Sequence, residues 1–214
     1  MKKIILLGDS IRMGYDKFVR SSLEGSAEVF YPSDNCKFTL YLLRFLRDWT
    51  RDGTLPADAD AVHWNAGLWD VVELYGDGPL VSPEVYAQSL ERLHRHLKMH
   101  FPKAKLIFAT STSVEEEKYG PDFSRKNKTI EEYNVIARRV LEPLGEEIDD
   151  LYSVSLRATA ECRSDMTHFN TDAGRLLMGG AVVECLCKAC GISPDTVKHG
   201  EISAENYSAQ NIGN

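Results

Sequence analysis

The sequence predicts a single α/β domain of three layers, α/β/α, built around a five-stranded parallel sheet. Five short apolar runs alternate with five segments of helical periodicity along the chain. No internal repeat and no break in composition interrupts this alternation, and 214 residues are enough to bury a core without disulfides or a structural metal. We therefore expect one domain over residues 1–192, followed by a polar tail over residues 193–214.

The strand predictions rest on apolar runs that end in turn residues. The first run is rich in Ile and Leu and stops at Gly8, as expected for a strand buried on both faces of a parallel sheet. The fifth run gives the weakest strand signal of the five. The expected strands are residues 2–7, 27–31, 61–64, 104–109 and 148–154.

The helix predictions rest on apolar spacing and on cap residues. Ser82-Pro83-Glu84 combines a cap, a proline at the first position and an acid in the first turn. Thr129 and Glu132 have the spacing of a capping box, and Thr171 can cap the last helix, which Gly191 ends. The expected helices are residues 10–25, 42–52, 83–101, 129–144 and 171–190.

Two connections lack periodicity. Residues 71–81 contain two glycines and a proline and are expected to be irregular, and residues 110–128 form a long charged loop. In a parallel sheet, functional groups collect in the loops at the carboxyl ends of the strands, so residues 110–128 could form a lid beside a site. The alternative is a solvated surface excursion.

Composition limits the possible partners and cofactors. A net charge of −7 argues against nucleic acid, and the apolar run after Met1 is too short for a signal peptide or a membrane span, so we expect a cytoplasmic protein. Five cysteines, an odd number, indicate free thiols. Cys185, Cys187 and Cys190 do not share one helical face, so no metal site is predicted. The stretch from Gly8 to Gly14 has neither the P-loop nor the dinucleotide-binding pattern, so no cofactor is predicted either.

The chemistry lies at the two ends of the predicted domain. Gly8-Asp9-Ser10 follows the first strand, where helix N–H groups can stabilise an adjacent oxyanion. Asp165 and His168, three residues apart, can place a carboxylate against an imidazole. Ser10, Asp165 and His168 together supply the side chains of nucleophilic acyl transfer. The plainer alternative is that Ser10 only caps a helix.

These blocks resemble those of the GDSL, or SGNH, hydrolases over about residues 2–190. The resemblance implies a flavodoxin-like three-layer fold and a serine esterase or acyl hydrolase. It implies Ser10 as the nucleophile, His168 as the general base and Asp165 as the carboxylate that orients it. It also implies an oxyanion hole made by the Ser10 amide, an amide of the second block and an asparagine side chain.

The chain departs from the family pattern in the second and third blocks. The turn over residues 33–37 has no glycine, and we assign its donor to the Cys36 amide or a neighbour. Residues 67–70 place Trp69 where the family has asparagine, so we prefer Asn65 as the side-chain donor, with a simple turn role as its alternative. Trp69 then either donates its indole N–H or forms a wall of the acyl pocket.

The expected function is hydrolysis of a small ester, such as an O-acetyl group on a carbohydrate, through an acyl-enzyme. The expected partner is a small-molecule ester, with neither nucleic acid nor membrane, and self-association is left open. The alternative is a catalytically retired flavodoxin-like binding module, which the altered second and third blocks favour.

Overall fold

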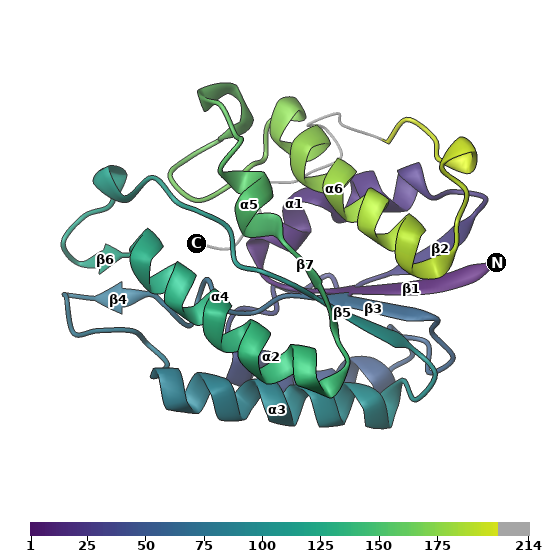
Figure 1. The fold of residues 1–214 in the computed structure, drawn as a ribbon, viewed down its shortest axis with the longest axis horizontal. Coiled ribbons are helices and arrows are strands. Elements are labelled where there is room, and N and C mark those ends of the chain that lie inside the picture. The colour runs from purple at the N-terminus through teal and green to yellow at the C-terminus, as the bar shows by residue number, and fades with distance from the viewer. Residues whose placement is uncertain (201–214) are drawn as a thin grey trace.

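The computed structural model describes residues 1–200, which form a five-stranded parallel sheet with helices on both faces (Figure 1). The strand order is β2-β1-β3-β5-β7, and every neighbouring pair is parallel. This confirms the predicted fold class. The strands are β1 (Lys2–Leu7), β2 (Ala27–Phe30), β3 (Ala61–Trp64), β5 (Lys105–Ala109) and β7 (Glu147–Asp149).

Helices α1, α5 and α6 cover one face of the sheet and α2, α3 and α4 cover the other (Figure 1). Residues 4–7 of β1 are completely buried, because this strand lies inside the sheet and both of its faces pack against helices. The α-helices are α1 (Ser10–Ser22), α2 (Thr39–Arg51), α3 (Pro83–His100), α4 (Asn127–Leu141), α5 (Leu151–Ser155) and α6 (Asp172–Cys190). Short 3₁₀ turns are η1 (Glu116–Lys118), η2 (Glu142–Leu144), η3 (Ala160–Cys162) and η4 (Pro194–Thr196).

The direction of the chain across the sheet reverses between β1 and β3. From β1 the chain moves outward to β2, then returns to the other side of β1 for β3, β5 and β7. At such a switch point the loops after the two strands diverge and leave a crevice at their carboxyl ends. Ser10 follows β1 and Asn65 follows β3, so the topology places both beside this crevice.

The two predicted loops contain short strands that pair with each other beyond the carboxyl ends of the main sheet (Figure 1). Strand β4 (Glu73–Leu74) pairs antiparallel with β6 (Phe123–Ser124). The ion pair from Lys126 to Glu73, at 2.8 Å, lies beside this pairing. Residues 71–81 and 110–128 are therefore joined into one structure.

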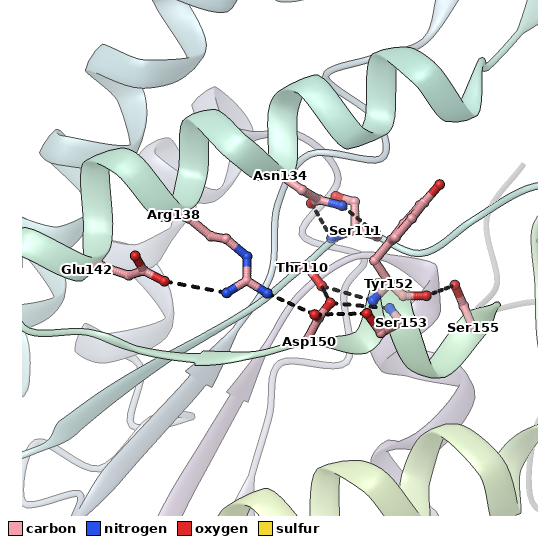
Figure 2. Close-up of polar contacts among 9 residues, drawn as sticks. All are labelled: Thr110, Ser111, Asn134, Arg138, Glu142, Asp150, Tyr152, Ser153 and Ser155. Atoms are coloured by element: carbon pink, nitrogen blue, oxygen red, sulfur yellow. Dashed lines mark hydrogen bonds and ion pairs between the residues drawn. The ribbon is translucent and has the colours of Figure 1, made fainter. Parts of the chain in front are cut away.

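The segment that leaves β5 toward this structure is held by polar side chains from α4 and from the turn before α5 (Figure 2). Asn134 makes a two-way contact with the Ser111 backbone, accepting from its N–H at 2.8 Å and donating to its carbonyl at 2.9 Å. Thr110 Oγ1 donates to Asp150 at 3.2 Å and accepts from the Tyr152 N–H at 2.9 Å. These bonds fix the base of the long loop.

Two predicted elements differ in the structure. The fifth strand ends at Asp149, although it was expected to run to residue 154. Residues 151–155 instead form helix α5, because Asp150 caps a helix there by accepting from the Ser153 N–H. Thr129 and Glu132 do not form a capping box, because α4 already begins at Asn127. The Asn127 N–H is accepted instead by Glu116 at 2.5 Å, from the preceding loop.

The caps predicted for the other two helices are confirmed. Ser82 accepts from the Val85 N–H at the start of α3, and Thr171 accepts from the Gly174 N–H at the start of α6. Gly191 ends α6 in the left-handed conformation, with φ of 66°. Each of these caps is formed by a residue adjacent in sequence to its helix.

Residues 193–200 lie against α1, through a Lys198 N–H bond to the Ser22 carbonyl at 2.8 Å and an ion pair between Lys198 and Glu24. The remainder of the predicted tail, residues 201–214, lies outside the described residues. Within residues 1–200, no helix is long and apolar enough to cross a membrane, and no cluster of potential metal ligands is found. All five cysteines are free thiols.

Candidate active site

Ser10 is the first residue of α1, directly after the turn that leaves β1. The helix is capped by Asp9, whose carboxylate accepts from the Ile11 N–H at 3.0 Å. The alternative in which Ser10 serves as the cap is therefore wrong. Because Asp9 satisfies the helix end, the Ser10 hydroxyl is left for other partners, although the residue is only 2% exposed.

His168 and Asp165 come from the loop that precedes α6 and complete a chain of hydrogen bonds with Ser10. The Nε2 atom of His168 lies 2.8 Å from Ser10 Oγ, and its Nδ1 atom lies 2.8 Å from Asp165 Oδ2. The structure thus brings together the three side chains that the sequence singled out. With the proton on Nδ1 facing the carboxylate, Nε2 presents a lone pair to the serine hydroxyl.

Asp165 is positioned by its own loop. Its Oδ1 atom accepts from the backbone N–H groups of Thr167 at 2.7 Å and His168 at 2.8 Å. Partial burial works to raise the pKa of Asp165, but the hydrogen bond from the His168 ring and the Thr167 N–H outweigh it and hold that pKa well below its usual range. The carboxylate beside His168 therefore stays ionised.

Asn65 lies immediately after β3 and beside the turn that carries Ser10. Its backbone N–H donates to the Leu7 carbonyl at 3.0 Å, which continues the β1–β3 ladder past the last strand residue. Its carboxamide packs against Gly8, where only a glycine leaves room for it. The structure thus packs the amide side chain of Asn65 against the turn that carries the predicted nucleophile.

Asp9 is a second buried carboxylate beside the serine. Burial raises the pKa of Asp9, and this is offset in part by the Asn65 side chain, the Ile11 N–H and the charges of Arg125 and His168. Asp9 therefore shares its surroundings with both the predicted oxyanion donor Asn65 and the histidine.

Cys36 does not offer the free amide that the sequence predicted. Its backbone N–H donates to the Gly8 carbonyl at 3.0 Å, so this donor is already used to join the turn after β2 to the turn after β1. Lys37 takes up the left-handed conformation that usually favours glycine, with φ of 48°, and its N–H donates to Asn35 Oδ1 at 2.8 Å. The turn therefore forms without a glycine.

Trp69 lines a cavity of about 510 Å³ that contains Ser10 and His168. The lining combines aromatic rings with polar and charged side chains and is contributed by the start of α1, the turn after β3, the long loop after β5 and the loop before α6. It comprises Ser10, Trp69, Tyr119, Gly120, Asp122, Phe123, Arg125, Asp165, Met166, Thr167 and His168.

The long loop is tied directly to the loop that carries the histidine. Tyr119 Oη lies 2.5 Å from Thr167 Oγ1, and the Glu115 N–H donates to the Met166 carbonyl at 2.9 Å. The sequence leaves residues 110–128 open as either a lid beside the site or a solvated surface excursion. Because part of this loop lines the cavity, it lies beside the site and forms one of its walls.

Three residues that support the site were missed in the sequence. Arg12 is fully buried and binds Asp16 at 2.6 Å and the carbonyls of Pro32 and Asp34. The spacing of Arg12 and Asp16 by four residues on a helix was an available signal. Asp70 accepts from the Thr39 hydroxyl at 2.6 Å, and burial raises its pKa to about 7 despite the Thr39 hydrogen bonds.

The third missed residue is Arg125, which no pattern in the sequence distinguishes. It lies in a charged loop between β6 and α4, and only the folded chain brings it to the cavity.

Known structures share this fold over most of their length. No protein-family model and no curated protein matches the sequence. A lipase/acylhydrolase from Enterococcus faecalis superposes with a TM-score of 0.66 at 20% identity, covering 94% of this chain and 100% of the other. The acetyl xylan esterase AlAXEase superposes with a TM-score of 0.67 at 16% identity, covering 86% and 99%.

A GDSL-like lipase from Bacteroides thetaiotaomicron superposes with a TM-score of 0.64 at 14% identity, covering 88% of this chain and 89% of the other. Identities this low bear on the fold alone. The chain therefore has the three-layer α/β/α fold of GDSL-like lipases and acylhydrolases, with its Ser10–His168–Asp165 hydrogen-bond chain at the switch point of the sheet.

Proposed function

We propose that this chain is a serine esterase or acyl hydrolase that cleaves a small ester through an acyl-enzyme. The observation that carries the proposal is the unbroken chain of hydrogen bonds from Ser10 Oγ to His168 and from His168 to Asp165, each 2.8 Å. Nucleophile, base and orienting carboxylate are the parts that acyl transfer needs, and these distances suit proton transfer.

In the proposed reaction, His168 removes the proton of Ser10 as Oγ attacks the ester carbonyl. Asp165 stabilises the imidazolium that forms, and His168 then gives its proton to the departing alcohol. A water molecule, activated by the same imidazole, attacks the acyl-serine and releases the acid. Each step moves one proton through Nε2 of His168.

The oxyanion is assigned to two donors. Ser10 occupies the first position of α1, where a backbone N–H has no acceptor within the helix, and the Asn65 carboxamide packs beside Gly8 in the same turn. The N–H of Cys36 is left out because it already bonds to Gly8. A hole with two donors in place of three is consistent with the missing glycine of the second block.

The substrate is proposed to be a small ester, with an O-acetyl group on a carbohydrate as the first candidate. The cavity of about 510 Å³ is within the usual size range of small-molecule sites, and an acetyl xylan esterase is among the proteins of the same fold. The aromatic lining suits the flat apolar faces of a sugar ring or an acyl group.

The test is hydrolysis of 4-nitrophenyl acetate by the wild type, Ser10→Ala and Ser22→Ala. Ser22 lies on the same helix and is equally buried, but it does not line the cavity, so it controls for loss of a buried hydroxyl. We expect activity in the wild type and in Ser22→Ala, and a loss of at least about a thousandfold in Ser10→Ala. Unchanged turnover in Ser10→Ala would contradict the proposal.

Labelling with a fluorophosphonate separates this function from its rival, the retired binding module. The engaged amide of Cys36 favours the rival, because it removes one expected oxyanion donor. A covalent adduct on Ser10, located by peptide mass spectrometry, supports the esterase. A folded wild type that is neither labelled nor active supports the binding module.

A further inference from the structure

Arg125 is a buried cation in the wall of the proposed catalytic cavity. It follows β6 directly and is only 5% exposed, yet it lines the same cavity as Ser10 and His168. A buried guanidinium is costly unless a partner compensates its charge. The nature of its partners therefore indicates what Arg125 is for.

The groups that hold Arg125 are all neutral. Its Nε–H donates to the Leu68 carbonyl at 2.6 Å and its Nη1–H donates to Tyr119 Oη at 3.2 Å. The rings of Phe123, Trp69 and Tyr119 surround the guanidinium, with centroids at 5.0, 5.6 and 5.9 Å from Cζ. These contacts orient the side chain but bring no negative charge.

No acidic side chain within residues 1–200 forms an ion pair with Arg125, and its Nη2 group makes no hydrogen bond to any described residue. Asp122 and Asp165 line the same cavity, but neither forms an ion pair with Arg125, and Asp165 is bonded to His168. The buried carboxylate of Asp9 lies close enough to feel the charge of Arg125, but it too forms no ion pair with the guanidinium. The neighbouring Lys126 pairs with Glu73 instead. One edge of the guanidinium is therefore available to a ligand.

A second buried arginine provides a comparison. Arg12 is fully buried, and its guanidinium meets the Asp16 carboxylate at 2.6 Å as well as backbone carbonyls. Arg12 thus has the compensated surroundings of a structural arginine. Arg125 has the backbone and hydroxyl contacts of such a site but lacks its anion.

The position of Arg125 is fixed relative to the proposed catalytic residues. Tyr119 bonds both to Arg125 and to Thr167, the residue before His168. This short connection holds the cation and the imidazole in one wall of the cavity. An anion held by Arg125 would therefore stay in a constant position relative to Ser10.

We propose that Arg125 binds a negatively charged group, a carboxylate or a phosphate, carried by the ester substrate. The proposal rests on the proposed esterase function and names the class of ester that this cavity selects. A guanidinium is well suited to carboxylate and phosphate oxygens, and the aromatic rings around it exclude water from the contact. The substrate anion would form the ion pair that Arg125 does not make with any described side chain.

The test compares kcat/KM for charged and neutral esters of similar shape. For an anion on the alcohol side, the substrates are 4-acetoxybenzoate, 4-acetoxyphenyl phosphate and the neutral methyl 4-acetoxybenzoate. For an anion on the acyl side, they are mono-(4-nitrophenyl) glutarate and the neutral 4-nitrophenyl pentanoate. The readout is the ratio of charged to neutral kcat/KM, measured for the wild type, Arg125→Gln, Arg125→Lys and Arg163→Gln.

Arg163 is a matched control because it too is held by neutral groups, but it lies outside the cavity lining. It donates to the carbonyl and hydroxyl of Ser113 and lies 4.5 Å from the Phe169 ring centroid. We expect the wild type and Arg163→Gln to prefer the charged ester of at least one pair by roughly 10- to 100-fold, the range of a charge-assisted hydrogen bond. Arg125→Gln should reduce that ratio to about one, and Arg125→Lys should retain part of it.

A wild-type ratio of one or less in both arms, or a preference that survives in Arg125→Gln, would overturn the inference. If Arg125→Gln does not fold, the ratio in Arg125→Lys decides, since that variant keeps the charge but loses the fork of donors. An unchanged ratio there counts against the inference.

The result also separates this inference from the proposed function. If neutral esters are cleaved through Ser10 without any charge preference, the esterase stands and the inference fails. If the wild type cleaves no ester, calorimetric titration with benzoate and with inorganic phosphate replaces the kinetic test. Binding that disappears in Arg125→Gln then supports the anion site, and equal or absent binding in both proteins overturns it.

Discussion

The carboxamide oxygen of Asn65 occupies the space in which a side chain on Gly8 would have to lie. A β-carbon at residue 8 would fall well inside van der Waals contact with Asn65 Oδ1, and it would also crowd Arg12. The glycine of the Gly8-Asp9-Ser10 turn therefore allows Asn65 to pack against the turn that carries the proposed nucleophile. Residues 8 and 65 are neighbours only because β1 and β3 pair in the sheet.

Gly8→Ala is predicted to lower kcat by about 10- to 100-fold by displacing Asn65, and to destabilise the protein by about 1–3 kcal/mol. The measurements are ester hydrolysis and urea unfolding. The Asn65→Ala single variant and the Gly8→Ala/Asn65→Ala double variant complete a double-mutant cycle. If Gly8 acts through Asn65, the double variant should have nearly the kcat of Asn65→Ala alone, whereas additive losses would contradict that coupling.

Asp165→Asn is predicted to reduce kcat by about 10²- to 10⁴-fold while the loop keeps its shape. An asparagine Oδ1 can still accept from the Thr167 and His168 N–H groups, but the amide no longer supplies a charge for the imidazolium. His168→Ala should lose at least as much. Circular dichroism checks the fold of both variants, and an Asp165→Asn enzyme within threefold of wild type would show that the carboxylate is dispensable.

Asp70→Asn is predicted to flatten the pH dependence of the free energy of unfolding. Burial raises the pKa of Asp70 to about 7 in the folded protein, against about 4 in the unfolded chain. Between these values the folded state retains a proton that the unfolded state has lost, so wild-type stability falls as pH rises from about 4 to 7. The full effect is on the order of 3–4 kcal/mol.

Urea unfolding of the wild type and Asp70→Asn at several pH values measures this effect. An asparagine can keep the acceptor for the Thr39 hydroxyl, so the packing at the start of α2 is retained. The two curves should diverge toward neutral pH, with the variant gaining relative stability. Parallel curves would mean that Asp70 ionises normally in the folded protein.

Two adjacent glycines of α6 are predicted to respond oppositely to alanine. A β-carbon at Gly180 meets nothing within 4 Å, so Gly180→Ala should stabilise the protein by about 0.5–1 kcal/mol through helix propensity. A β-carbon at Gly179 would collide with the Phe18 ring of α1, so Gly179→Ala should destabilise it by about 1–3 kcal/mol. Thermal and urea unfolding measure both, and equal effects would contradict the close packing of α1 on α6.

Much of the fold could be predicted because its signals are local. The buried run before Gly8 identified β1, and Ser82 and Thr171 identified helix starts because each accepts a hydrogen bond from an N–H three residues later. The capping box predicted at Thr129 failed because the partner that sets the helix start is distant in sequence. The start of α4 is set by Glu116, eleven residues earlier, which no capping rule anticipates.

The residues of the candidate site likewise fall into those that the sequence predicted and those that only the structure revealed. Asp165 and His168 are three residues apart, so their contact was readable from spacing, and the family resemblance connected them to Ser10. Cys36 was predicted to be an oxyanion donor, but its backbone N–H bonds to the Gly8 carbonyl and so joins the turns after two neighbouring strands. Arg125 was missed because its proposed role depends on its burial in the cavity wall without an ion-pair partner, which only the packed cavity reveals.

The sequence by itself determined the α/β class, the order of most elements and the three side chains of the proposed triad. These follow from periodicity, turn residues and short spacings, which act within a few residues. Only the tertiary structure decided which amides remain free, how closely Asn65 packs against Gly8, and that Arg125 enters the cavity without an ion-pair partner. Those features depend on burial and on contacts between distant segments, and both arise only when the sheet and its loops assemble.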